Sequence, residues 1–176
     1  MQSFRDFAAE NAHLDATSFA QAHPEPHLIV RFPRPDRGSE ESSFLTRALT
    51  VEEIKAGRPA DGEWIVPVAK RPGSNAFATM VTIGRAGNND VVLQHSSVSK
   101  FHAYLRHMGS SWTVSDAGSR NGTLLDERKL PPERSFPLHS GAKIVLSEAV
   151  SLEFLLPGDL HAAVRAKLNE SGLGEA

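Results

Sequence analysis

Residues 142–156 read AKIVLSEAVSLEFLL, and this stretch decides the fold class because it holds two short apolar runs separated by a few turn residues. In the second run, Val150, Leu152, Phe154 and Leu156 fall on one face, and Ser151 and Glu153 alternate with them on the other. Strict alternation is typical of an antiparallel strand that packs one face against a core. We therefore expect strands at 142–146 and 150–156, with Leu156 on the buried face.

Short apolar runs of the same kind recur upstream, between turn residues, at intervals of about 8–12 residues. The predicted strands lie at residues 64–69, 77–83, 91–93, 101–106, 112–114 and 123–125. Pro67 predicts that the first of them is an edge or bulged strand, because proline has no N–H to give to a neighbour. The repeated pattern predicts an all-β sandwich or barrel that begins near Glu63.

The first 62 residues and the C-terminal end follow another pattern. An apolar stripe that includes Phe4, Phe7 and Phe19 predicts one amphipathic helix up to about Gln21, which ends before the prolines that follow. Residues 27–32 suit a strand, and residues 50–56 suit a capped helical turn. Residues 159–169 predict a last helix with Asp159 as its N-cap. We divide the chain into an extension (1–62), a β-domain (63–156), and a C-terminal helix and tail (157–176).

The composition excludes several classes of protein. The 176 residues are 40% hydrophobic and 23% charged, which is ordinary for a globular domain. The formal net charge of -2 argues against general binding to nucleic acid or anionic membranes. The sequence has no cysteine, which excludes disulfides, thiolate zinc sites and cysteine nucleophiles. It has neither a long apolar run nor an apolar secretory signal, so we expect a soluble, cytoplasmic protein without membrane insertion.

Three polar clusters lie in loops between predicted strands: IGRAGNND (83–90), SSVSKFH (96–102) and DAGSRNGT (116–123). Arg85 follows Gly84 at a strand end, where its guanidinium can bind a phosphate through two parallel N–H groups. Taken alone, Arg85 is better interpreted as a solvated surface residue. Ser99 and Lys100 add a hydroxyl and a positive charge, and Asn121-Gly122 is a strong turn signal.

An enzymatic function fits these residues poorly. His102 and His107 would lie on opposite faces of a predicted strand, and no carboxylate is spaced for a shared metal site. Asp116, Ser99 and His102 could form a triad on paper, but no G-x-S-x-G elbow is present. No G-K-[ST] follows Gly87, so the glycines do not form a P-loop. We expect neither catalysis nor a cofactor or metal.

Taken together, Gly84-Arg85, Ser99-Lys-Phe-His102 and Asn121-Gly122 resemble, in order and spacing, the forkhead-associated (FHA) domain over about residues 63–156. The resemblance implies a β-sandwich of about 11 strands in two twisted antiparallel sheets. It also implies that loops at one end of the sandwich bind peptides that carry phosphothreonine.

The resemblance assigns a role to each motif residue. Arg85 and Ser99 would bind the phosphate, Lys100 would add a polar or basic contact, and Asn121 would hold the peptide main chain. Arg120 stands where many members have a small polar residue, so it would reach the phosphate or select flanking residues. The remaining motif residues would be structural: Gly84, His102 and Gly122.

The expected function is therefore that of a phosphothreonine-binding adaptor in Ser/Thr kinase signalling. Its partner would be a phosphothreonine protein, such as a kinase or a kinase substrate, and not a nucleic acid. The alternative is an FHA-like scaffold that binds proteins without phosphate. A further hypothesis is that Thr17, Thr46 or Thr50, once phosphorylated, is captured by the chain's own site.

Overall fold

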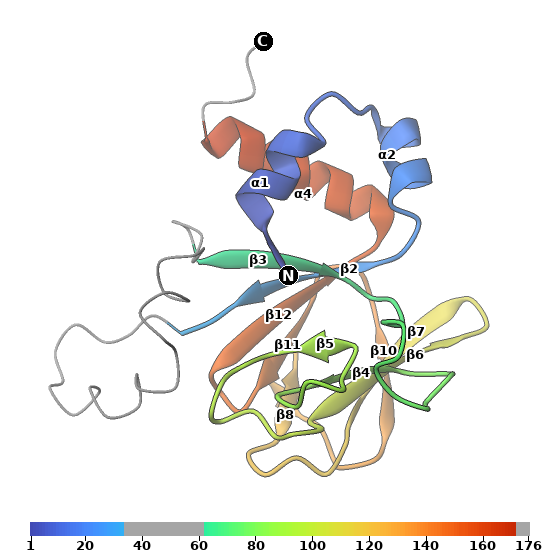
Figure 1. Ribbon diagram of the computed structural model, residues 1–176, viewed down its shortest axis with the longest axis vertical. Helices are drawn as coiled ribbons and strands as arrows, with labels where there is room; N and C mark the ends of the chain where they lie inside the picture. Colours follow the sequence, from blue (N-terminus) through green and yellow to red (C-terminus); the bar gives the residue numbers. More distant parts are fainter. Residues whose placement is uncertain (34–61, 172–176) are drawn as a thin grey trace, which may run out of the picture.

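The computed structural model describes residues 1–33 and 62–171, which form two β-sheets and three helices (Figure 1). The larger sheet has the order β1 (Gln2–Ser3), β3 (Glu63–Pro67), β2 (His27–Arg31), β12 (Val150–Leu155), β11 (Ala142–Leu146), β8 (Thr123–Leu125) and β9 (Arg128–Lys129). The smaller sheet has the order β10 (Ser135–Leu138), β7 (Ser111–Asp116), β6 (Ala103–Met108), β4 (Val81–Gly84) and β5 (Val91–Val92). All neighbouring strands are antiparallel except β4 and β5, which are parallel. The predicted β-sandwich is confirmed.

The core between the two sheets is built from alternating residues of their strands. On β12, Val150, Leu152 and Phe154 are fully buried in this core. Leu155 is also buried, but on the opposite face of the sheet, where helices cover it. The prediction for Leu156 is wrong: it lies beyond the strand and is 41% exposed, because the chain turns there into the last helix.

A layer of three helices covers the outer face of the larger sheet, at the top of Figure 1: α1 (Phe4–Glu10), α2 (Ala16–Ala22) and α4 (Pro157–Glu170). Helices and sheet share a second apolar cluster, which includes Phe19, Ile29 and Leu160. Strand β2 therefore has both faces covered. Leu28 and Val30 belong to the sandwich core, and Ile29 faces the helices. This double burial explains why β2 reads as a continuous apolar run.

Two strands that precede residue 63 belong to the larger sheet. Strand β2 pairs along its whole length with β12 on one side and β3 on the other. Strand β1 pairs with β3 only at Trp64 and Ile65, so Pro67 lies where that side of β3 has no neighbouring strand. The sandwich thus draws strands from both sides of residue 63.

The prediction of one N-terminal helix is wrong, because the chain forms two helices with a break between them. Asn11 ends α1, and its side-chain amide donates to the carbonyl of Phe7 (2.8 Å). Asp15 begins α2 by accepting a hydrogen bond from the Ser18 amide (2.8 Å). Side chains of asparagine and aspartate compete with the helix for backbone hydrogen bonds in this way. The spacing of apolar residues does not reveal this competition. The two helices still present one apolar side to the sheet.

Three further predictions need correction. The strand predicted at 77–83 exists only as β4, because the Phe77 amide is bound by the side chain of Asn75 (3.1 Å) instead of a strand neighbour. The last helix begins at Pro157 with Leu156 as N-cap, so Asp159 lies within its first turn. Strands β9 and β10 were not predicted. The predicted turn at 50–56, with Thr46 and Thr50, lies outside the described residues.

No helix within residues 1–33 and 62–171 is both long and apolar enough to cross a membrane.

Candidate functional site

The three polar clusters form loops that are joined by backbone hydrogen bonds. The loop after β4 meets the loop after β5, because the amides of Arg85 and Ala86 donate to the carbonyls of Ser99 (2.9 Å) and Lys100 (3.1 Å). The turn between β11 and β12 meets the third loop through the Ser147 amide, which donates to the Gly122 carbonyl (3.0 Å). Residues up to about 60 positions apart in the sequence thus form one surface.

Gly84 allows the first two loops to approach each other. A Cβ atom at this position would lie 2.4 Å from the carbonyl oxygen of Lys100 and 2.9 Å from the side-chain nitrogen of Asn89. That nitrogen itself donates to the Lys100 carbonyl (2.6 Å). The lack of a side chain at Gly84 is therefore what lets strand β4 contact the loop that carries Ser99.

Arg85 lies along the second loop with its side chain exposed. Its Nε donates to the carbonyl of Val98 (3.1 Å), which fixes the direction of the guanidinium. The two terminal nitrogens of Arg85 form no hydrogen bond with any described residue. The group can therefore offer two parallel donors to an anion.

His102 is fully buried and organises the second and third loops. Its Nδ1 accepts the amide hydrogen of Ser99 (3.0 Å), so its Nε2 carries the proton and donates to the carbonyl of Gly122 (3.1 Å). Burial lowers the pKa of His102, which keeps the ring neutral, as this pair of bonds requires. Both hydrogen bonds of the ring are thus made with backbone groups of the loops.

Ser99 connects the second loop to the third. Its hydroxyl oxygen accepts the amide hydrogen of Arg120 (3.0 Å), and the hydroxyl hydrogen is left to donate. The side chains of Arg120 and Lys100 are exposed and form no hydrogen bond with the described residues. Three positively charged residues therefore adjoin Ser99: Arg85 and Arg120 through their backbone amides, and Lys100 as the next residue in the chain.

Asn121 is held by a residue that the sequence did not single out. Its side-chain nitrogen donates to the Ser97 carbonyl (2.9 Å), and the same carbonyl accepts the hydroxyl hydrogen of Ser147 (2.7 Å). The amide oxygen of Asn121 has no hydrogen-bond donor among the described residues. Ser147 lies in a turn remote in sequence, and no local signal marked it.

Two buried carboxylates shape the loops. Asp116 accepts hydrogen bonds from the amides of Gly118 and Ser119 and from the hydroxyls of Ser119 and Thr123. Burial by itself would raise the pKa of Asp116, but these hydrogen bonds outweigh it and lower the pKa. Asp116 therefore stays ionised and fixes the fold of the third loop.

Asp90 has the same role for the first loop. Its buried carboxylate pairs with Lys70 (2.7 Å) and accepts from the amides of Arg71 and Thr82. Burial opposes ionisation, but the Lys70 and Ser74 hydrogen bonds lower the pKa of Asp90 far below its usual range. The carboxylate ties the segment before β4 to the loop that follows it.

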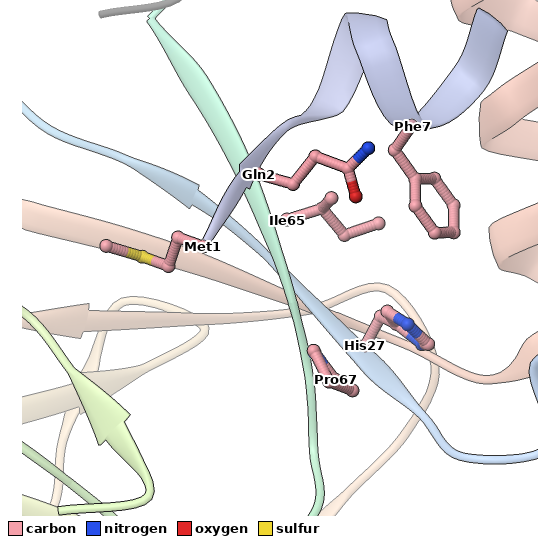
Figure 2. Close-up of a pocket in the computed structure, with 6 residues that line it drawn as sticks. All are labelled: Met1, Gln2, Phe7, His27, Ile65 and Pro67. Atoms are coloured by element: carbon pink, nitrogen blue, oxygen red, sulfur yellow. The ribbon is translucent and has the colours of Figure 1, made fainter. Parts of the chain in front are cut away.

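A pocket of about 290 Å³ lies elsewhere, between the chain's first residues and strands β2 and β3 (Figure 2). Its lining is mostly apolar: Met1, Gln2, Phe7, His27, Ile65 and Pro67. The described residues contain no group of three or more histidine or carboxylate side chains placed to hold a metal ion. The polar loops are therefore the better candidate site.

Comparison with known proteins agrees with this choice. The FHA domain family model matches residues 81–147, which include the three loops and the turn at Ser147. FhaB from Mycolicibacterium smegmatis, an FHA domain-containing protein, is 41% identical over 64 residues, which are 36% of this chain and 41% of FhaB. An FHA domain-containing protein of Arabidopsis thaliana is 29% identical over 110 residues, 62% of this chain and 26% of that protein. The chain thus spans between a quarter and two fifths of the length of these relatives.

Solved structures of FHA domains are similar to this chain at low sequence identity. The MEK1 FHA domain is 19% identical with a TM-score of 0.48, and the match covers 78% of this chain and 93% of that one. The MEK1 FHA domain in complex with a HOP1 phosphothreonine peptide is 24% identical with a TM-score of 0.44, covering 53% and 88%. The family match itself rests on residues 81–147, where the sandwich strands and the candidate site lie together. Residues 81–147 of the chain therefore match the FHA domain family.

Proposed function

We propose that this protein is a phosphothreonine-binding adaptor, and that the loops around Arg85 and Ser99 are its binding site. The proposal is carried by one observation: Arg85 has two unbonded terminal nitrogens, and its backbone is hydrogen-bonded to Ser99, whose hydroxyl hydrogen remains available. A phosphate near pH 7 carries a charge of about -1.5 to -2 and three acceptor oxygens. A guanidinium fork and a hydroxyl are matched donors for such a group.

The neighbouring residues complete the proposed site. Lys100 and Arg120 add positive charge beside the phosphate, and the amide oxygen of Asn121 would accept an N–H of the peptide main chain. Gly84, His102 and Gly122 would act through the backbone, holding the loops in register. The site would bind without catalysis and without a cofactor.

The partner would be a protein phosphorylated on threonine by a Ser/Thr kinase, or the kinase itself. In this proposal the protein acts in the cytoplasm as an adaptor. It would recognise the peptide and not nucleic acid or a membrane.

A direct test is a titration with an oriented phosphothreonine peptide library, together with the same library unphosphorylated and with phosphoserine. Arg85→Ala should weaken phosphothreonine binding at least about tenfold, because a charge-assisted hydrogen bond contributes about 1.5–3 kcal/mol. Arg85→Lys should recover only part of the loss, since lysine cannot form the planar fork. Arg5→Ala, on an exposed face of α1, is the matched control and should bind like the wild type.

The alternative function predicts the opposite pattern. A scaffold that works without phosphate would bind phosphorylated and unphosphorylated partners equally, and Arg85→Ala would change nothing. That result would exclude the adaptor proposal.

A further inference from the structure

Three aromatic rings and one guanidinium form a partly exposed row beside the candidate site. The ring centroids of Phe77 and Phe101 are 5.9 Å apart with planes 15° from parallel, and those of Phe101 and Tyr104 are 6.0 Å apart at 27°. The guanidinium carbon of Arg106 lies 4.9 Å from the centroid of Tyr104. We call these four residues the aromatic row. Phe77 is 49% exposed and Phe101 is 36% exposed, so water and not protein covers much of the row.

The row is held in place by the fold. Tyr104 and Arg106 alternate on β6 with the buried core residues Ala103 and Leu105, so they stand on the outer face of the smaller sheet. Phe77 is fixed by its amide, which donates to the side-chain oxygen of Asn75 (3.1 Å).

Asn75 is itself anchored to the rest of the fold. Its side-chain nitrogen donates to the hydroxyl of Thr82 (3.0 Å) and to the carboxylate of Asp90 (3.3 Å). The rings are therefore presented to solvent by a bonded framework instead of folding back into the core.

The row is continuous with the proposed phosphate site. Phe101 stands between Lys100 and His102, within the loop that carries Ser99. The carbonyl of Lys100 accepts hydrogen bonds from Ala86 (3.1 Å) and Asn89 (2.6 Å), so the row begins where the Arg85 and Ser99 loops are joined. Its two steps of about 6 Å correspond to about four residues of extended peptide.

Two positively charged residues, Lys100 and Arg106, adjoin or belong to the row. Arg106 forms no side-chain hydrogen bond to the described residues, and Lys100 beside Phe101 is exposed. The carboxylate of Asp90, which accepts hydrogen bonds from Asn75 and Thr82 beneath the row, is buried and occupied by these bonds. An occupant that combines apolar and acidic side chains would therefore complement this surface.

We propose that the aromatic row binds the segment that flanks the phosphothreonine in the same peptide, and that this segment carries an apolar side chain and an acidic one. The proposal rests on the proposed phosphothreonine site. The apolar side chain packs on Phe77 and Phe101, and the acidic one pairs with Arg106. Exposed rings beside cations also suit single-stranded nucleic acid, but the formal net charge of -2 disfavours that occupant.

The test is a position-scanning phosphothreonine peptide array, read with the wild type, Phe77→Ala/Phe101→Ala and Arg106→Gln. The wild type should select an apolar and an acidic residue within about four positions on one side of the phosphothreonine. Phe77→Ala/Phe101→Ala should abolish the apolar preference and weaken the best peptide at least fivefold. Arg106→Gln should abolish only the acidic preference. Met108→Ala, an exposed apolar residue at the far end of β6, is the matched control and should change neither.

A short phosphothreonine peptide with alanine flanks separates this proposal from the one on which it rests. Its affinity should fall in Arg85→Ala and stay within twofold of wild type in Phe77→Ala/Phe101→Ala. If Arg85 matters but the array pattern survives loss of both rings, the row is not a peptide subsite and only this proposal fails. If Arg85 does not matter, both proposals fail.

A measurement on the wild-type protein tests the proposal even if the variants fail to fold. On titration with the best array peptide, the aromatic NMR signals of Phe77 and Phe101 should shift, and with the alanine-flanked peptide they should not. Equal shifts with both peptides would contradict the proposal. Displacement of the best peptide by a single-stranded oligouridylate would instead identify the row as a nucleic-acid surface and overturn it.

Discussion

The helical layer and the loop site are built by different kinds of interaction. Helices α1, α2 and α4 cover the larger sheet with apolar side chains such as Phe19 and Leu160, which are fully buried. The loop site is held by hydrogen bonds of His102, Asp116 and neighbouring backbone groups. The first region removes apolar area from water, whereas the second fixes the positions of polar atoms.

This difference predicts how the two regions respond to substitution. In the helical layer, lost contacts should reduce the free energy of unfolding and leave the site intact. In the loops, a change at one residue should move the donors that face the ligand, because the loops are bonded to each other. Stability and recognition should therefore be largely separable in this protein.

The largest effect is expected for Phe19→Ala in the helical layer. Phe19 is fully buried against Phe7 and His161, and removing a buried phenylalanine side chain costs about 3–5 kcal/mol. Urea unfolding should show this loss, while the folded variant binds phosphothreonine peptide with wild-type affinity. The exposed Thr17→Ala on the same helix is the control. A drop in affinity parallel to the loss of stability would show that the two regions are coupled.

A smaller loss of stability, but a loss of binding, is expected for Gly84→Ala. The added Cβ would lie 2.4 Å from the Lys100 carbonyl oxygen, so the two loops must separate, at a cost of about 1–3 kcal/mol. The change should also weaken phosphopeptide binding, because it moves Arg85 relative to Ser99. Gly87→Ala in the same loop has open space around its Cβ and should alter stability by at most about 0.5 kcal/mol. Equal behaviour of the two variants would contradict this account.

The smallest effect is a dependence of stability on pH, to which His23 and His27 beside the helical layer contribute. Burial lowers the pKa of both His23 and His27 below the ordinary 6.5. As the pH falls through 6.5, these histidines take up protons in the unfolded chain but remain neutral in the folded chain. The free energy of unfolding therefore decreases until the pH has fallen below the folded-state pKa values. The melting temperature should drop by a few degrees between pH 7.5 and 5.5.

Variants at single histidines locate this effect. His27→Gln should flatten the pH dependence, and His13→Gln, at an exposed position, should leave it unchanged. The lowered pKa values of Asp90 and Asp116 matter only below their ordinary value of 3.8, outside this pH range. A slope that His27→Gln does not alter would place its origin at other histidines, such as the buried His102.

Local sequence patterns predicted much of the fold. They failed where contacts between residues far apart in the chain determine the structure. The alternation in β12 and the apolar runs of β2, β6 and β11 were sufficient, because the apolar side chains that make these patterns are buried in a core. Strand β9 was missed because both of its residues are exposed at a sheet edge, and β10 because its apolar alternation is limited to Phe136 and Leu138 on either side of a proline. The break at Asn11 was missed because side-chain caps interrupt a helix without disturbing its apolar stripe.

The residues of the candidate site also divide into those that the sequence indicated and those that it missed. The sequence pointed to Arg85, Ser99, Lys100, Arg120 and Asn121 because their residue types and spacing resemble a family. It did not indicate Ser97 or Ser147, whose roles depend on a carbonyl and a hydroxyl meeting across 50 positions. It also gave Phe77 to a strand, although the hydrogen bond from its amide to Asn75 places it in a loop beside Phe101.

By itself, the sequence determined that the chain forms a β-sandwich and which loops are the candidates for its binding site, because burial patterns and residue types are local properties. The tertiary structure decided the rest: that the first residues supply β2 and a helical cover, that His102 connects two loops, and that three rings line up beside the site. The physical reason is that hydrogen bonds and ring contacts join residues far apart in the chain. Their geometry exists only once the backbone has brought them together.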